Sequence, residues 1–86
     1  MNPHSLPLTF AIAKTHTLDA MEAVLAIARR GGCHLASLQL RDGPGATQVA
    51  LELHASAPEL LALFLTRLHN LHDIDDLSWA GQDPGP

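Results

Sequence analysis

Six histidines and one cysteine are the side chains in this sequence best suited to bind a metal or to act as nucleophiles. His69 and His72 are three residues apart, a spacing that puts two imidazoles on one face of a helix. However, no cysteine or glutamate stands at a helical position that would complete a ligand set, and a helix ending near Asn70 would separate the two rings. We therefore expect no metal site and interpret these histidines as exposed groups at a helix C-terminus.

The only cysteine, Cys33, is followed directly by His34, which raises the possibility of a thiol nucleophile with an adjacent base. Adjacent residues of a strand point to opposite faces, so these two side chains cannot share a proton. We expect no catalytic residue here and interpret Cys33 as a buried or edge-strand side chain.

Two further segments have the composition of ligand-binding loops but lack the surrounding pattern. Asp73, Asp75 and Asp76 are not framed by the Asp-x-Asp-x-Asp-Gly sequence of a calcium loop. Gly43-Pro44-Gly45 is not followed by the helix that a phosphate-binding loop requires. The sequence therefore predicts a solvated acidic loop and a tight turn.

The composition indicates a single small domain. The chain has 86 residues, of which 47% are hydrophobic, and nine acids against five Lys and Arg give a formal charge of −4. This charge argues against nucleic-acid binding. Apolar runs are far shorter than the roughly 20 residues that span a bilayer, and the N-terminus lacks a secretory signal pattern. With one cysteine and no internal disulfide, we expect a cytoplasmic protein that is not membrane-bound.

Hydrophobic periodicity predicts the first two elements. Leu8, Phe10 and Ile12 alternate with small residues in a strand over 8–14. A helix follows, with a start capped by Thr17 or by an Asp19-x-x-Glu22 box and an end at Gly31-Gly32. Its inner face is predicted to contain Ala20, Met21, Val24, Leu25, Ile27 and Ala28.

A hairpin follows this helix. The segment 33–42 alternates, but Leu35 is out of phase with Leu38 and Leu40, which indicates a bulge or a late strand start. A turn over 42–45 leads to a strand over 47–54, whose alternation predicts one wet face.

The last part of the chain contains a helix and a strand. Ser56-Ala57-Pro58-Glu59 has the pattern of a capping box that starts the helix. Its inner stripe is predicted to contain Leu61, Phe64, Leu65, Leu68 and Leu71. Leu63 falls on the outer side, in a patch without acids that is a candidate surface for a partner protein. A strand follows over 72–80.

The element order predicts an α+β fold. Strand, helix, strand, strand, helix, strand is the ferredoxin-like βαββαβ plan, a four-stranded antiparallel sheet with two helices on one face. We assign 1–7 to an N-terminal extension, 8–80 to the domain and 81–86 to a disordered tail. The second strand should lie at a sheet edge, so we expect a homodimer through Ala36, Ser37, Leu38 and Gln39.

Three segments of the chain carry a family resemblance. The segment EAVLAIARRGGCHLASL from Glu22 to Leu38, with VxLEL from Val49 and LxxLxD from Leu68, resembles the ACT domain. More narrowly, these segments are similar to the short small subunits of acetolactate synthase (acetohydroxyacid synthase) of the isozyme II type. The resemblance covers roughly 8–80.

The resemblance implies a regulatory subunit that has no chemistry of its own. Such a chain would bind and activate the acetolactate synthase large subunit in branched-chain amino-acid biosynthesis. Thiamine diphosphate, Mg²⁺ and FAD would then belong to that catalytic partner, and this chain would hold no cofactor.

In valine-responsive relatives, an amino acid binds at a dimer interface, between the loop after strand one and the start of strand two. The family loop pattern Asn-x-x-Gly-x-Leu aligns with His16, Asp19 and Met21 here. Asp19 replaces the glycine and adds a negative charge that would repel an effector carboxylate. At the start of strand two, His34 stands where the family has Asn. The candidate effector-binding residues are His16, Thr17, Asp19, His34 and Leu35.

These departures favour the isozyme II type, which the resemblance implies has no functional valine site. The alternative is a stand-alone ACT sensor that binds a small amino acid, for example a branched-chain one, between two protomers and acts on another enzyme or regulator.

Overall fold

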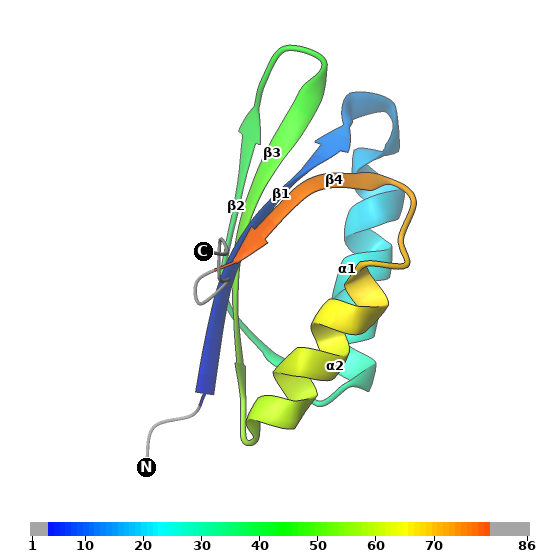
Figure 1. Cartoon of the computed structure of the whole chain (residues 1–86). Helices are drawn as coiled ribbons and strands as arrows, with labels where there is room; N and C mark the ends of the chain where they lie inside the picture. Colours follow the sequence, from blue (N-terminus) through cyan, green and yellow to red (C-terminus); the bar gives the residue numbers. More distant parts are fainter. Residues whose placement is uncertain (1–3, 80–86) are drawn as a thin grey trace, which may run out of the picture.

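The computed structural model describes residues 4–79, and their elements follow the predicted order (Figure 1). All strand pairs are antiparallel, and the sheet order is β2-β3-β1-β4. This is the predicted ferredoxin-like fold. The elements are β1 (His4–Ala13), the 3-10 turn η1 (Lys14–His16), α1 (Thr17–Arg30), β2 (His34–Asp42), β3 (Ala46–Ala55), α2 (Pro58–Leu68) and β4 (Ile74–Trp79).

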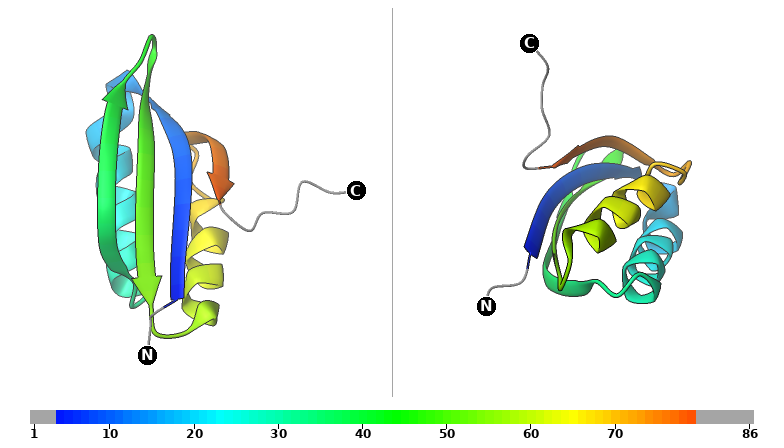
Figure 2. Two further views of the ribbon diagram at one scale, coloured as in Figure 1. Left: turned by 90° about the vertical axis from the view of Figure 1, so that its left-hand side faces the viewer. Right: turned by 60° about the horizontal axis from the view of Figure 1, so that its bottom comes forward.

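The core lies between the sheet and the two helices, which cover the same face of the sheet (Figure 2). The central strands β1 and β3 alternate between buried and more exposed residues, as their sequences predicted. Each fully buried large side chain stabilises the fold by about 1.5 to 3 kcal/mol. The largest of these side chains are Phe10, Phe64, Ile12, Leu53 and Leu68.

Helix α1 starts without either of the predicted caps, so both alternatives for its start were wrong. Within residues 4–79, no side chain caps this helix, and its N-cap residue is His16. The chain instead enters α1 through η1, and Thr17 Oγ1 lies 3.0 Å from Thr47 Oγ1 on β3. Thr17 already has helical backbone dihedrals, with φ −56° and ψ −48°, so it is the first residue of the helix rather than its cap.

The end of α1 follows the prediction. Gly32 has a φ of +75°, and the Cys33 N–H donates to the Ala28 carbonyl at 2.9 Å. This is a Schellman-type stop, which favours glycine because a Cβ disfavours the left-handed conformation. The predicted inner face needs one correction: Leu25 is exposed, because it lies at the side of α1 toward β2 rather than over the core.

The predicted bulge in β2 is confirmed. Leu35 pairs with Leu53 but Ser37 pairs with Glu52, so Ala36 is the extra residue. The extra residue restores the phase, and it places Leu35, Leu38 and Leu40 together on the helix side of the sheet.

Helix α2 begins at Pro58, with Ala57 rather than Ser56 at its N-cap. In the part of the chain that the structure describes, no side chain caps α2, so the predicted capping box was wrong. Ser56 lies one residue too far from the helix to serve its first N–H groups. The helix ends at Leu68, so Leu71 lies beyond it, although it still packs on the core.

The two outer limits of the sheet also differ from the prediction. β1 begins at His4 instead of Leu8, because Leu6 is buried opposite Leu53 and carries the pairing with β3 further. Part of the assigned N-terminal extension therefore belongs to the sheet. β4 begins at Ile74, two residues later than predicted, and it contains a register shift near Asp76, whose φ is +57°. The predicted tail over 81–86 lies outside the described residues.

Candidate functional site

The predicted effector-binding residues fall into two groups at opposite ends of α1. His16, Thr17 and Asp19 lie at its N-terminal end, whereas His34 and Leu35 follow its C-terminal end. The helix has 14 residues, which corresponds to about 21 Å at 1.5 Å per residue. Within one chain, the two groups therefore do not line one pocket.

The first group lies beside the β2-β3 hairpin. The Thr17–Thr47 contact holds the start of α1 against β3, and Lys14 Nζ lies 3.0 Å from Asp42 Oδ1 at the end of β2. His16 and Asp19 are exposed. Asp19 is thus an accessible negative charge in the first turn of α1.

The second group borders a pocket of about 290 Å³ between α1 and the start of β2. Arg29 and His34 supply polar groups at its rim. Burial of Cys33 raises the pKa of its thiol, which keeps it protonated and a weak nucleophile at neutral pH. The pocket therefore suits an apolar group rather than covalent chemistry. Its lining residues are Leu25, Ala28, Arg29, Gly32, Cys33, His34 and Leu35.

The predicted dimer edge is an edge of the observed sheet, since within residues 4–79 β2 pairs with β3 alone. Its residues Ala36, Ser37 and Gln39 are exposed, and Leu38 is half-buried. The left view of Figure 2 shows β2 as the outermost strand, with α1 behind it. The outer side of this strand therefore presents backbone groups that are free to pair with another strand.

Exposed leucines gather along this same side of the molecule. Of the five large hydrophobic residues that are exposed in the described part of the chain, four lie on α1 or β2. They are Leu18 (79% exposed), Leu25 (36%), Leu35 (49%) and Leu40 (51%), and we call them the leucine edge. This surface was not predicted from the sequence, because the helical period placed Leu25 in the core and no pattern singled out Leu18.

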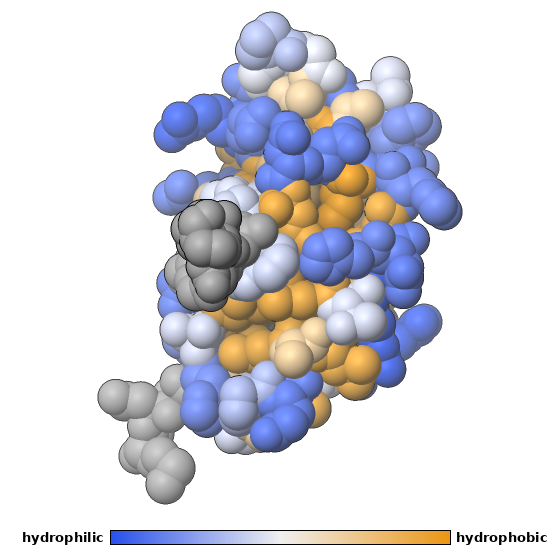
Figure 3. Space-filling view, in the orientation of Figure 1, coloured by the Kyte–Doolittle hydropathy of each residue, from blue (hydrophilic) through white to orange (hydrophobic). Residues whose placement is uncertain are grey.

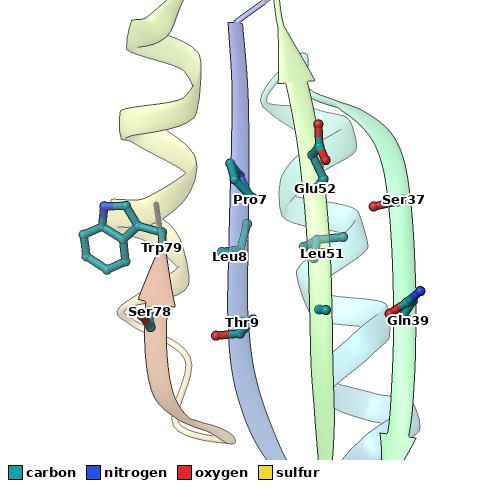
Figure 4. Close-up of a pocket in the computed structure, with 10 residues that line it drawn as sticks. Pro7, Leu8, Thr9, Ser37, Gln39, Leu51, Glu52, Ser78 and Trp79 are labelled. Atoms are coloured by element: carbon teal, nitrogen blue, oxygen red, sulfur yellow. The ribbon is translucent and has the colours of Figure 1, made fainter. Parts of the chain in front are cut away.

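The open face of the sheet carries a second hollow of about 530 Å³, lined by both polar and apolar side chains (Figure 4). Thr9, Ser37, Gln39 and Ser78 contribute hydroxyl and amide groups to it. Glu52 also lines it and is paired with His54 at 2.9 Å between Oε2 and Nε2. The wet face predicted for the β3 strand is this surface. Its exposed groups offer hydrogen bonds, and the contact between Glu52 and His54 lies at its margin.

At the β4 edge of the sheet, opposite the β2 edge, apolar side chains are visible at the surface between α2 and β4 (Figure 3). Several residues of α2, β4 and the segment between them are half-buried against the core. They include Leu65, Leu71, Leu77 and Trp79. Leu63, the candidate residue for partner binding, is 43% exposed on α2, as its outer position predicted.

The histidine and aspartate positions considered as metal ligands lie near the end of α2 and at β4. His69 Nδ1 is 2.8 Å from the Leu65 carbonyl oxygen, and its ring meets Trp79 edge-on at 5.7 Å. Among residues 4–79, no group of three or more His, Cys, Asp or Glu side chains is placed to hold a metal ion. The helices of the same range are too short or too polar to cross a membrane.

No family model matches the sequence, and no curated protein sequence matches it either. Solved structures match the fold well. The C-terminal domain of the MgtC protein from Mycobacterium tuberculosis aligns with a TM-score of 0.72 at 9% identity, covering 91% of this chain and 86% of that one. The ACT domain of GTP pyrophosphokinase from Chlorobium tepidum aligns with a TM-score of 0.70 at 6% identity, covering 90% and 97%.

These similarities establish that the chain has the fold of an ACT domain. The de novo designed protein Foldit4 also aligns, with a TM-score of 0.66 at 9% identity, covering 93% of this chain and all of that one. Because a designed sequence shares the architecture, the fold alone does not define an activity. The function must be argued from the surfaces described above.

Proposed function

We propose that this chain is a non-catalytic regulatory domain that binds an enzyme and changes its activity. The observation that carries the proposal is the ACT-domain fold, which occurs in GTP pyrophosphokinase as one domain of an enzyme. The burial of Cys33 supports it, because a buried, protonated thiol is a weak nucleophile.

For the partner enzyme, we propose the large subunit of acetolactate synthase, with this chain as a small subunit of the isozyme II type. The resemblance of the segment from Glu22 to Leu38 supports this assignment. That segment forms α1 from Glu22 onward, the glycine stop and the first half of β2, and it includes Leu25 and Leu35 of the leucine edge. Thiamine diphosphate, Mg²⁺ and FAD would be bound by the large subunit. The small subunit would act by binding its active arrangement more tightly than its inactive one.

Reconstitution tests this proposal directly. The purified chain is mixed with the acetolactate synthase large subunit from the same organism, and acetolactate formation is measured with and without valine. We expect stimulation that valine does not reverse, because Asp19 places a negative charge where an effector carboxylate would bind. The absence of both stimulation and co-elution would reject the subunit assignment.

We also propose that the chain forms a homodimer through the outer side of β2. Antiparallel pairing of two β2 strands satisfies the free backbone groups and places leucines of both copies on the same, helix-covered side. Leu40 is the best position for a test, because it is half exposed, whereas Leu38 packs partly against the core. Leu40→Lys is expected to shift the mass measured by light scattering from dimer to monomer without changing the circular dichroism spectrum.

A second candidate is a stand-alone sensor for a branched-chain amino acid. The observation that favours it is the position of the predicted effector residues at opposite ends of α1. Two copies related by antiparallel β2 pairing would bring His16 and Asp19 of one copy toward His34 of the other. Valine added to the natural chain tests this reading: a rise in the thermal midpoint, with binding measured by calorimetry, would support a sensor. No binding of valine by the natural chain would reject it.

A further inference from the structure

One straight stripe of α1 faces the outer side of β2. Leu18, Glu22, Leu25 and Arg29 are spaced i, i+4, i+7 and i+11, which places them on one narrow face of the helix. Leu25 and Arg29 line the pocket that also contains Leu35 of β2, so this face borders the sheet edge. All four residues are exposed. We call them the α1 stripe.

Charge and hydrophobicity differ between the two ends of α1. The first half of the helix carries acids and the exposed Leu18, and the last turn carries arginines beside an apolar pocket. Asp19 and Glu22 lie in the first half of the helix, and Arg29 and Arg30 lie in its last turn. Leu18, at the start of the stripe, is the most exposed large hydrophobic residue in the described part of the chain. The 290 Å³ pocket lies at the other end of the stripe. A second copy running in the opposite direction would match each of these features.

The dimer proposed above would bring two such stripes together at the same level. Thr17 contacts Thr47, which pairs with Asp42 at the end of β2, and Cys33 directly precedes the start of β2. The segment from Thr17 to Cys33 therefore runs alongside the whole of β2, and the midpoints of the two are Leu25 and Leu38. A two-fold axis through the middle of the β2 ladder passes near Leu25.

Rotation about this axis exchanges positions that are equally far from Leu25. Glu22, three residues before it, comes close to Arg29 of the second copy, four residues after it. Leu18, seven residues before it, comes to the level of Gly32 of the second copy, which is in the wall of the pocket. The charge pair and the fit of Leu18 to the pocket therefore both favour the same antiparallel arrangement of the two helices.

We propose that α1 packs antiparallel against α1 of a second copy, with Leu18 of each copy in the pocket of the other and Glu22 paired with Arg29 across the interface. This inference rests on the proposed dimer through β2 and adds to it the side chains that select the partner. It makes the leucine edge one continuous interface in which strands, leucines and helices all contribute.

Charge exchange between the two stripe positions is the sharpest test. Glu22→Arg brings two arginines together at each of the two symmetric contacts, and Arg29→Glu brings two glutamates together. We expect each single variant to raise the dimer dissociation constant about tenfold, as measured by sedimentation equilibrium at low salt. An equimolar mixture of the two variants restores complementary pairs at both contacts, so it should form heterodimers with the affinity of the natural chain.

Leu18→Glu tests the apolar contact, and Leu63→Glu is its matched control because Leu63 is an exposed leucine on the other helix. We expect Leu18→Glu to weaken the dimer at least about a hundredfold, since two leucines per dimer are lost from pockets. Leu63→Glu should leave the dissociation constant unchanged. All of these positions are exposed in the single chain, so the variants should fold normally, which circular dichroism verifies.

The outcomes separate this inference from the dimer on which it depends. A natural chain that sediments as a monomer at all concentrations would reject both. A dimer that is broken by Leu40→Lys but unaffected by Leu18→Glu and by both charge variants would keep the β2 interface and reject the packing of α1. Weakening by each charge variant, with recovery only in their mixture, would support the proposed pairing.

Discussion

The side chain of Cys33 lies in the connection between α1 and β2, where its Sγ is 3.8 Å from the Leu60 carbonyl oxygen of α2. Desolvation by this burial raises the pKa of the thiol above its ordinary value of 9.0. The protonated form is therefore favoured in the folded state more than in the unfolded state. Both states are protonated below pH 9, so the contribution to stability is complete there, and it is lost as the pH rises through the folded-state pKa.

This sign gives a testable pH dependence for Cys33→Ala. The free energy of unfolding of the natural chain should exceed that of the variant by a constant amount between about pH 6 and pH 8. The difference should then shrink from about pH 9 upward, because the unfolded thiol loses its proton first. Urea denaturation of both proteins across this pH range measures it. A difference that grows at alkaline pH would contradict the burial of a neutral thiol.

Single residues also show where sequence reasoning succeeded and where it failed. The phase of Leu35 predicted the bulge, because strand alternation is a local property of the chain. The caps at Thr17 and Ser56 were predicted from equally local patterns and were wrong. The start of a helix also depends on contacts with other elements, and the contact between Thr17 and Thr47 joins residues 30 positions apart.

At the scale of elements, the boundary between α1 and β2 determines the geometry of the proposed interface. Gly31 and Gly32 stop the helix, and β2 begins two residues later, which places the end of the α1 stripe beside Leu35. The hydrophobic period fixed the inner face of α1 except at Leu25, which lies at its margin. A helical wheel gives the direction of a side chain but not the width of the sheet beneath it, so it could not show that β2 leaves Leu25 uncovered.

Gly32→Ala tests the strain at this boundary. A Cβ at Gly32 would meet Leu60 Cδ1 at 3.6 Å, an ordinary contact, so the cost comes from the φ of +75° alone. We expect the free energy of unfolding to fall by about 1 kcal/mol. Gly32→Asn should cost less, because asparagine tolerates this conformation better than other residues that have a Cβ. Equal loss in both variants would indicate a steric rather than a conformational cause.

At the scale of the whole molecule, the sequence predicted the order of elements and hence the sheet. The family resemblance drew the candidate effector residues from two segments, and in a single chain the length of α1 separates His16 from His34. The leucine edge was not predicted, since it combines residues of a helix and a strand that only the tertiary structure places side by side. In the proposed dimer, both features would combine residues of two copies.

Association should make the thermal stability of the chain depend on its concentration. A domain of 86 residues buries only about 60% of the surface that its unfolded chain exposes, so covering the leucine edge in the proposed dimer would contribute substantially to its stability. If unfolding is coupled to dissociation, the midpoint temperature should rise by about 3 to 5 °C for each tenfold increase in protein concentration. Differential scanning calorimetry of the natural chain and of Leu40→Lys provides the comparison. The variant should unfold at a lower temperature that does not change with concentration. A midpoint of the natural chain that is equally insensitive would mean that the isolated domain is stable with its leucine edge in water.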